Sequence, residues 1–291
     1  MNFFKKPKIL IYGSKGWIGG LFIKYLKENN PKIKIIEGAC RVSDVLLLKN
    51  EIKTVKPTHI ISFIGRTHGI IDNVAINTID YLEYPGKLIE NVRDNLFCPI
   101  TLADICTKQG IHYTYLGTGC IFDGYTFTED SLPNYFGSGY SVVKGFTDRL
   151  MKNYPVLNLR IRMPIHSVKN GRNFITKILG YSKICSIQNS MTILDDFFPI
   201  FTDLMLKKKT GAYNCTNPGT VTHNRILKLY KNIIDPNFAW KNMTISEQSK
   251  ILKSERSNNS LNTSKIEDEY PQLKDIDTAV NDVLVKMKTK M

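Results

Sequence analysis

The sequence Lys8-Ile9-Leu10-Ile11-Tyr12-Gly13-Ser14-Lys15-Gly16-Trp17-Ile18-Gly19 joins a short apolar run to a loop with three regularly spaced glycines. The apolar run predicts a buried strand, and the apolar residues from Trp17 to Glu28 recur at helical spacing. Glycines at such a place let the backbone approach a pyrophosphate, while the following helix presents free N–H groups and a partial positive charge. A glycine triplet alone also suits an ordinary tight turn. Its position between a strand and a helix therefore favours a dinucleotide site.

Strands and helices alternate through the first half of the chain. Apolar runs predict further strands over 33–36, 57–65, 112–116 and 157–161, and helical spacing predicts helices over 45–55, 88–109 and 141–154. This alternation predicts an α/β fold with a parallel sheet covered on both faces, and ligands then bind beyond the carboxyl ends of the strands. After Arg162 the alternation weakens. We therefore expect residues 1–165 to form the nucleotide-binding domain, with segments of about 190–215 returning to it, and residues 166–291 to form mainly a smaller substrate-binding lobe.

The composition is that of an ordinary globular protein, with 42% hydrophobic and 23% charged residues among 291. No run of 18 or more apolar residues occurs, and Met1 to Lys8 is too short and too charged for a secretory signal. We therefore expect a soluble, cytoplasmic protein with no membrane partner. The six cysteines show no C-x-x-C spacing, which indicates reduced thiols and neither a disulfide framework nor a structural metal.

The formal net charge of +14 suits nucleic acid, an anionic membrane surface or a polyanionic small substrate. Most of the excess is lysine spread along the chain. There is no basic helix, arginine-rich tract or aromatic ladder of the kind that reads bases. We therefore expect no nucleic-acid partner.

Tyr140 and Lys144 form a Y-x-x-x-K pair at the start of a predicted helix, so both side chains share one face. The unperturbed pKa of tyrosine, about 10, is too high for ready proton exchange at neutral pH, and a neighbouring ammonium lowers it. The same lysine is expected to bind the nicotinamide ribose. The pattern arises by chance in many helices, but a glycine loop upstream favours catalysis here. Thr118, at the end of the preceding strand, is placed to hydrogen-bond a carbonyl oxygen that Tyr140 protonates.

A cofactor that carries a 2′-phosphate needs a cation near its adenosine ribose. Lys15 lies in the glycine loop, and Arg41 follows the second predicted strand. Glu37 lies near the end of the same strand and leaves NADH possible. The sequence favours NADPH.

Together these motifs resemble the extended short-chain dehydrogenases/reductases, in particular the branch that reduces 4-keto-6-deoxy nucleotide sugars. Within it, the chain is similar to the bifunctional 3,5-epimerase/4-reductases that make UDP-rhamnose, and it is related to the dTDP-4-dehydrorhamnose reductases. The resemblance covers nearly the whole chain, and its segments include 12–20, 56–59, 118–122, 160–165, 172–177, 189–195, 216–219 and 256–259. The sequence departs from the reductases at Gly119-Cys120, where they carry an acidic-aromatic pair, and from the plant enzymes at 65–69.

The resemblance implies a Rossmann-type doubly wound sheet, a nucleotide-sugar substrate, a homodimer and a set of site residues. For catalysis it implies Cys120 and Lys177 as the acid/base pair of epimerisation, beside Thr118, Tyr140 and Lys144. The cofactor contacts expected are Gly13, Ser14, Lys15, Gly16, Trp17, Ile18, Gly19, Arg41, Tyr140 and Lys144. The substrate contacts expected are Thr118, Cys120, Met163, Pro164, Asn173, Arg256, Ser257 and Asn258.

Three alternatives stay open at this point. The chain is compatible with a dTDP-4-dehydrorhamnose reductase without epimerase activity, with a fucose-type synthase that uses another nucleotide, and with a non-catalytic NADPH-binding sensor of the same fold. Thr118, Tyr140 and Lys144 together argue against the sensor, which has no need of all three. The sequence does not distinguish UDP from dTDP.

Overall fold

The computed structural model describes residues 6–290, and its internal contacts divide the chain into two compact units. The first unit contains the chain up to Gly117, together with Val142–Leu159 and Phe201–Ala212. The second contains Thr118–Ser141, Arg160–Ile200 and the chain from Tyr213 onward. Which ligand each unit binds stays a prediction.

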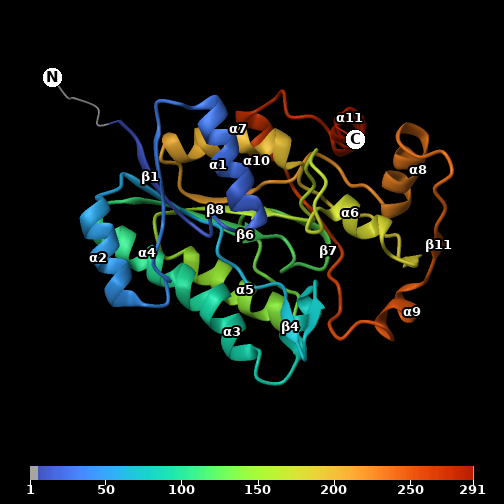
Figure 1. The fold of residues 1–291 in the computed structure, drawn as a ribbon, viewed down its shortest axis with the longest axis horizontal. Helices are drawn as coiled ribbons and strands as arrows, with labels where there is room; N and C mark the ends of the chain where they lie inside the picture. The colour runs from blue at the N-terminus through green and yellow to red at the C-terminus, as the bar shows by residue number, and fades with distance from the viewer. Residues whose placement is uncertain (1–5, 291) are drawn as a thin grey trace. The chain divides into compact units, whose positions relative to one another are not determined.

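A six-stranded sheet has the strand order β10-β8-β6-β3-β1-β2 (Figure 1). Strand β1 pairs in parallel with both β2 and β3, and β3 pairs in parallel with β6. The order therefore reverses beside β1, which is where a doubly wound sheet binds its ligand. This confirms the predicted α/β class. The strands are β1 (Lys8–Tyr12), β2 (Lys34–Glu37), β3 (His59–Ser62), β6 (His112–Thr118), β8 (Val156–Ile161) and β10 (Gly211–Asn214).

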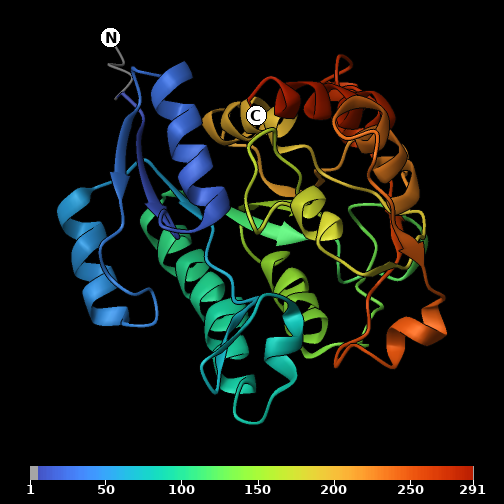
Figure 2. The ribbon, with the colours of Figure 1, turned by 45° about the vertical axis from the view of Figure 1, so that its right-hand side comes forward.

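Helices cover both faces of the strands of the first unit. Helix α1 (Trp17–Asn29) lies on one face, and α2 (Val45–Val55) and α4 (Cys98–Gln109) lie on the other (Figure 1 and Figure 2). On the second face Leu48 and Leu102 belong to the same buried cluster as Leu10 and Ile60 of the strands. Each such side chain contributes about 1.5–3 kcal/mol when fully buried. The predicted alternation thus folds into the expected layers.

The predicted helix 88–109 is interrupted by a π turn. The segment consists of α3 (Leu88–Val92), the π segment η2 (Arg93–Phe97) and α4. Pro99 has no N–H to donate to the carbonyl of Asn95, four residues earlier. That carbonyl instead accepts a hydrogen bond from the Thr147 hydroxyl at 2.6 Å. Thr147 lies in α5 (Gly139–Met151), the helix predicted over 141–154.

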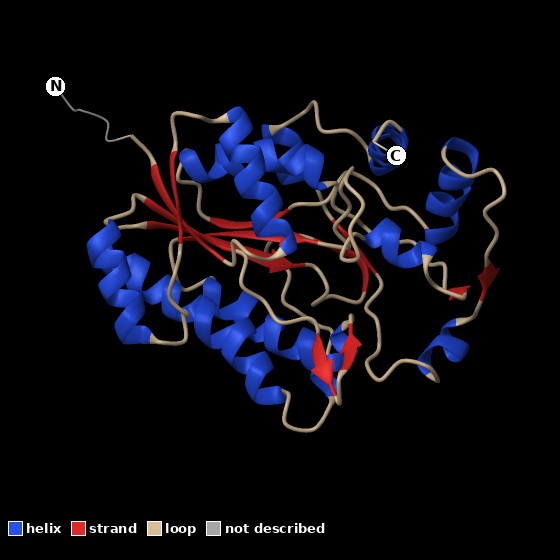
Figure 3. Ribbon diagram, viewed as in Figure 1, coloured by secondary structure: helices blue, strands red, loops and turns tan. Residues whose placement is uncertain are grey.

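A hairpin between β3 and α3 was not predicted (Figure 3). Strands β4 (Gly69–Ile71) and β5 (Val74–Ile76) pair antiparallel around Asp72 and Asn73, which both have positive φ. Two consecutive positive φ values are typical of a two-residue hairpin turn, and Asp and Asn tolerate them well. A 3₁₀ segment, η1 (Ile79–Glu83), follows.

Helices also pack around a separate apolar core in the second unit. Three helices contribute to this core: α6 (Phe174–Leu179), α8 (His223–Ile233) and α11 (Ile276–Lys288). Their buried residues include Ile175, Ile178, Leu227, Val280 and Leu284. Short strand pairs link distant segments: β7 (Gly124–Phe127) pairs with β12 (Asn259–Leu261), and β9 (Lys183–Ile184) with β11 (Lys241–Asn242). The remaining helices are α7 (Leu194–Leu206), α9 (Ile245–Ser249) and α10 (Ser264–Glu269). Among residues 6–290, no helix has the length and apolar character needed to span a membrane.

Candidate active site

Two glycines of the loop in the first unit, Gly13 and Gly19, have no room for a side chain. Gly13 has a φ of +77°, and a Cβ there would lie 2.8 Å from the backbone carbonyl carbon of Phe63. A Cβ on Gly19 would lie 2.3 Å from the Gly13 carbonyl oxygen. Helix α1 starts from Gly16 with no capping side chain and no acidic residue in its first turn. Its first N–H groups are therefore suited to an anion, so the loop fits the predicted pyrophosphate.

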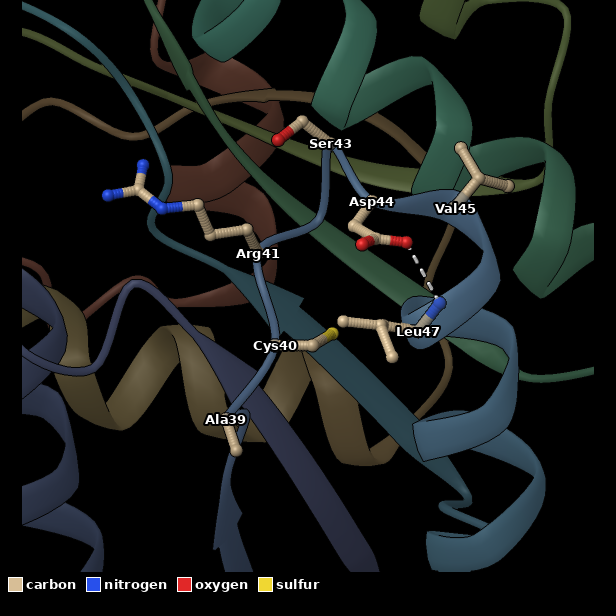
Figure 4. A pocket seen from close by; sticks show the side chains of 7 residues that line it. All are labelled: Ala39, Cys40, Arg41, Ser43, Asp44, Val45 and Leu47. Atoms are coloured by element: carbon tan, nitrogen blue, oxygen red, sulfur yellow. Dashed lines mark hydrogen bonds between the residues drawn. The ribbon is translucent and has the colours of Figure 1, made fainter.

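A pocket of about 680 Å³ follows β2 in the same unit (Figure 4). The guanidinium of Arg41 is exposed and extends away from the other side chains of the pocket. No ion pair or side-chain hydrogen bond within residues 6–290 engages it. Lys15, in the glycine loop, is exposed too, as is Glu37 at the end of β2. The pocket is lined by Ala39, Cys40, Arg41, Ser43, Asp44, Val45 and Leu47.

Glu51 of α2 fixes the loop that leads to Arg41. Its carboxylate accepts hydrogen bonds from the Ala39 N–H at 2.6 Å, the Cys40 thiol at 2.9 Å and the Tyr12 hydroxyl at 2.8 Å. Burial, followed by the bond to Glu51, raises the pKa of Cys40 to about 12. The Cys40 thiol is therefore held protonated beside the pocket.

Thr118, Cys120 and Tyr140 come together in the second unit at the carboxyl end of β6. The Thr118 hydroxyl accepts a hydrogen bond from the Cys120 N–H at 3.1 Å and is hydrogen-bonded to the Tyr140 phenol. Burial raises the pKa of Tyr140, the nearby Cys120 raises it further, and the bond to Thr118 lowers it. The direction is opposite to that expected from a neighbouring ammonium. The phenol is therefore set up to hold its proton and give it to a stronger base, as a general acid does.

Lys144, four residues after Tyr140 on α5, is buried in the first unit. Its ammonium donates hydrogen bonds to the Tyr115 hydroxyl at 2.5 Å and the Leu116 carbonyl at 3.4 Å. It also lies 4.5 Å from the centre of the Tyr115 ring. These contacts fix the end of the lysine side chain near the carboxyl end of β6. The predicted contact with a nicotinamide ribose stays a prediction.

Lys177, on α6 of the second unit, has an unusually acidic ammonium. Burial lowers its pKa to about 8, and the positive charges of Arg172 and Arg256 contribute further. An amine with a pKa near 8 has both of its protonation states well populated near neutral pH, as an acid/base catalyst requires. The role that the resemblance implies for Lys177 stays a prediction.

Asn173 has a role that the sequence analysis did not predict. Its side-chain oxygen caps α6 by accepting the Ile175 N–H, and its amide group donates to the carbonyls of His166 at 2.6 Å and Val168 at 3.1 Å. The side chain is buried. Its polar atoms are therefore engaged in building the helix that carries Lys177.

The predicted substrate residues near the C-terminus are also tied into the second unit. Ser257 is buried and accepts hydrogen bonds from Arg162 on both its hydroxyl and its carbonyl. Asn258 donates its N–H to Asp123 at 2.8 Å. Arg256 donates to the carbonyl and the hydroxyl of Ser254.

Met163 and Pro164 follow β8 in the second unit and are both half-buried. Met163 has a φ of 41°, a left-handed conformation that costs a non-glycine residue energy and is enriched at functional sites. The direct substrate contacts expected of the pair stay predictions.

Sequence reasoning assigned no role to Asn259 and Arg162. The buried Asn259 amide donates to the carbonyls of Gly119 at 2.9 Å and Phe122 at 2.6 Å, and so fixes the backbone around Cys120. The Arg162 guanidinium reaches the Cys120 sulfur at 3.5 Å. A charged residue directly after a fully buried strand was the available signal for Arg162. Asn259 offered none beyond a polar residue in a polar segment.

A parallel sheet whose first strand leads through a glycine loop into a helix defines an α/β dinucleotide-binding protein. The chain belongs to the NAD dependent epimerase/dehydratase family, whose pattern matches residues 9–166. This agrees with the resemblance drawn from the motifs.

Individual relatives support the same placement. Protein L780 of Acanthamoeba polyphaga mimivirus is 52% identical over 97% of this chain and 99% of its own length. The crystal structure of the L780 UDP-rhamnose synthase matches with a TM-score of 0.93 over 97% of this chain and all of that one, at 52% identity. The bifunctional dTDP-4-dehydrorhamnose 3,5-epimerase/dTDP-4-dehydrorhamnose reductase of Arabidopsis thaliana is 42% identical over 92% of this chain and 89% of the relative.

A more distant structure shows the fold alone. The dTDP-4-dehydrorhamnose reductase of Bacillus anthracis, in complex with NADP, matches with a TM-score of 0.80 and 15% identity over 97% of this chain and all of that one.

Proposed function

We propose that this chain epimerises a UDP-linked 4-keto-6-deoxyglucose at C3 and C5 and then reduces it at C4 with NADPH to give UDP-L-rhamnose. The observation that carries this proposal is the convergence of Thr118, Cys120 and Tyr140 at one strand end of the second unit. The names of the mimivirus and Arabidopsis relatives support the same chemistry.

Epimerisation needs a base and an acid on opposite faces of the sugar. The C4 ketone makes the hydrogens at C3 and C5 acidic, because the electron pair left by the proton spreads onto the ketone oxygen as an enolate. Cys120 as thiolate takes the proton and becomes a thiol. The Lys177 ammonium returns a proton to the other face of the same carbon and becomes an amine. Each well-placed group of this kind accelerates a reaction roughly 10²- to 10⁴-fold.

Reduction at C4 requires a proton donor for the alkoxide that develops on oxygen. Tyr140 gives its phenolic proton to that oxygen, and Thr118 donates a hydrogen bond to it. The raised pKa of Tyr140 keeps the proton in place until the stronger base forms. When bound, NADPH supplies the hydride.

The first unit supports the cofactor assignment. Gly13, Gly16 and Gly19 would hold the pyrophosphate, and Lys15 or Arg41 would bind the 2′-phosphate. The exposed Arg41 beside its pocket supports NADPH over NADH. Glu37 is the residue that would favour NADH.

Product identification tests the proposal. The protein is incubated with UDP- or dTDP-4-keto-6-deoxyglucose and with NADPH or NADH, and the sugar formed is identified by NMR. UDP-L-rhamnose is expected, formed faster with NADPH. A 4-reduced sugar that keeps its original configuration at C3 and C5 would identify a reductase without epimerase activity. The absence of any turnover of either sugar would support a binding protein instead.

We also propose a homodimer. The first unit has exposed apolar side chains, which suit contact with a second copy of the chain. They include Leu88, Ile89, Phe97, Phe146 and Leu150. Light scattering after gel filtration should give a mass twice that of the 33.2 kDa chain. A mass that stays at one chain across the micromolar range would reject the dimer.

A further inference from the structure

Arg162 is a charged side chain buried to 1% exposure within the second unit. One terminal nitrogen donates to the Cys120 sulfur at 3.5 Å and to the Ser257 hydroxyl at 3.0 Å. The other donates to the Ser257 carbonyl at 2.6 Å and to the side-chain oxygen of Asn189. The guanidinium therefore contacts three neutral oxygens and one sulfur.

This arrangement lacks a permanent counter-charge in direct contact. Burying an unpaired ion costs several kcal/mol, so a buried guanidinium calls for an anion. No salt bridge within the described part of the chain includes Arg162. Asp123 adds a favourable charge, but its carboxylate is exposed and accepts the Asn258 N–H. The Cys120 sulfur is the contacting group that can become an anion.

The other titratable groups around Arg162 and Cys120 do not provide an anion in contact with the guanidinium. Burial raises the pKa of both Tyr140 and Tyr135, so their phenols stay neutral. Burial and the charge of Arg162 lower the pKa of His223 to about 4, so its imidazole is neutral at pH 7. Tyr125 is exposed.

We propose that Arg162 is a positioning residue, held by Asn189 and Ser257, whose guanidinium orients the Cys120 sulfur and stabilises the negative charge that the sulfur carries as a base. The anionic sulfur is the form that removes a proton beside the ketone. That C–H bond breaks, its electron pair passes into the enolate, and an S–H bond forms. The inference rests on the proposed role of Cys120 and adds the residue that positions its sulfur for that role.

Thiol alkylation tests the charge on the sulfur without substrate or cofactor. Iodoacetamide reacts with thiolates, and peptide mass spectrometry separates Cys120 from Cys40, the other partly exposed cysteine. In the wild type, Cys120 should be alkylated rapidly at pH 7. Arg162→Gln should slow that reaction by about 10-fold or more and move its pH profile upward, since one pH unit changes the thiolate fraction tenfold. Arg162→Lys should restore most of the rate because it keeps the charge.

Cys40 is the internal control. Its thiol donates to Glu51, and its pKa is raised to about 12, so it should react slowly and equally in all variants. A folded Arg162→Gln variant with wild-type Cys120 alkylation would overturn the proposal.

A second variant covers the case in which Arg162→Gln does not fold. Asn189→Asp keeps the oxygen that accepts from Arg162 but gives it a negative charge, which competes with the sulfur for the guanidinium. It should slow Cys120 alkylation while thermal unfolding and NADPH binding report an intact protein. An unchanged Cys120 rate in this variant would also overturn the proposal. If the wild type alkylates as expected but exchanges no deuterium into the keto sugar, then the proposed function fails and the inference about the sulfur stands.

Discussion

Asn173 and Lys177 are coupled through helix α6: the Asn173 carbonyl accepts the Lys177 N–H at 3.0 Å, and the Asn173 side chain caps the same helix. The residue predicted to bind substrate therefore positions the residue predicted to move protons.

We expect Asn173→Ala to destabilise the protein by about 0.5–2 kcal/mol through the lost cap. It should also slow Lys177-dependent proton exchange. Asn173→Ser, which keeps a capping oxygen but, like alanine, lacks the amide donor, is the matched control in urea unfolding. Equal unfolding midpoints for Asn173→Ala and the wild type would contradict the capping role.

Replacing Lys177 with methionine should stabilise the protein at pH 7. Burial lowers the pKa of this lysine in the folded state to about 8, so the folded protein binds its proton less strongly than the unfolded chain does. The destabilisation caused by this charge is fully present below pH 8. It disappears as the pH rises towards about 10.4, the pKa of lysine in the unfolded chain. The gain in melting temperature of Lys177→Met should therefore be largest at pH 7 and shrink at pH 10. A gain that does not change with pH would mean that the charge of Lys177 is not the cause.

Arg256→Ala should have two separable effects. Arg256 helps to lower the pKa of Lys177. Its removal should therefore move the alkaline inflection in the plot of deuterium-exchange rate against pH to higher pH. If Arg256 also pairs with the diphosphate of the substrate, KM should rise as well. Arg225→Ala is a control, because this exposed arginine pairs with Asp277. An unchanged KM would reject the substrate contact, and an unchanged inflection would reject the influence on Lys177.

The double variant Lys15→Ala/Arg41→Ala should weaken NADPH binding by about 10-fold or more, since each lost charge-assisted hydrogen bond is worth about 1.5–3 kcal/mol. NADH has no 2′-phosphate, so its binding should be nearly unchanged. Isothermal titration calorimetry with both cofactors measures the difference. A clear preference for NADH that is the same in the wild type and the double variant would reject the phosphate assignment.

The elements of the first unit were largely predictable because their signals are local. The run from Lys8 to Gly19 carries its strand, loop and helix in consecutive residues, and α2 was predicted with its observed bounds. The π segment before Pro99 was not predicted. It depends on a carbonyl that Thr147 satisfies from 52 residues away in the chain.

The second unit was predicted less well because long-range contacts organise it. The backbone around Cys120 is fixed by Asn259, which lies more than a hundred residues later. Lys177 was identified through resemblance, but its shifted pKa arises mainly from burial, and in part from Arg256, which is distant in the sequence. Similarly, the strand ahead of Arg162 contains no acidic residue and so suggested no partner for its charge.

Deuterium exchange into the keto sugar tests the central claim, that one chain first moves protons and then reduces. UDP-4-keto-6-deoxyglucose is incubated in heavy water with NADPH and the Tyr140→Phe variant, and NMR follows the sugar carbons while absorbance follows NADPH. Our account predicts deuterium at C3 and C5 at close to the wild-type rate, with hydride transfer nearly abolished. Cys120→Ala and Lys177→Ala should instead lose exchange at one or both carbons while still binding NADPH. If both of these variants exchange at the wild-type rate, or if Tyr140→Phe consumes NADPH normally, the account is contradicted.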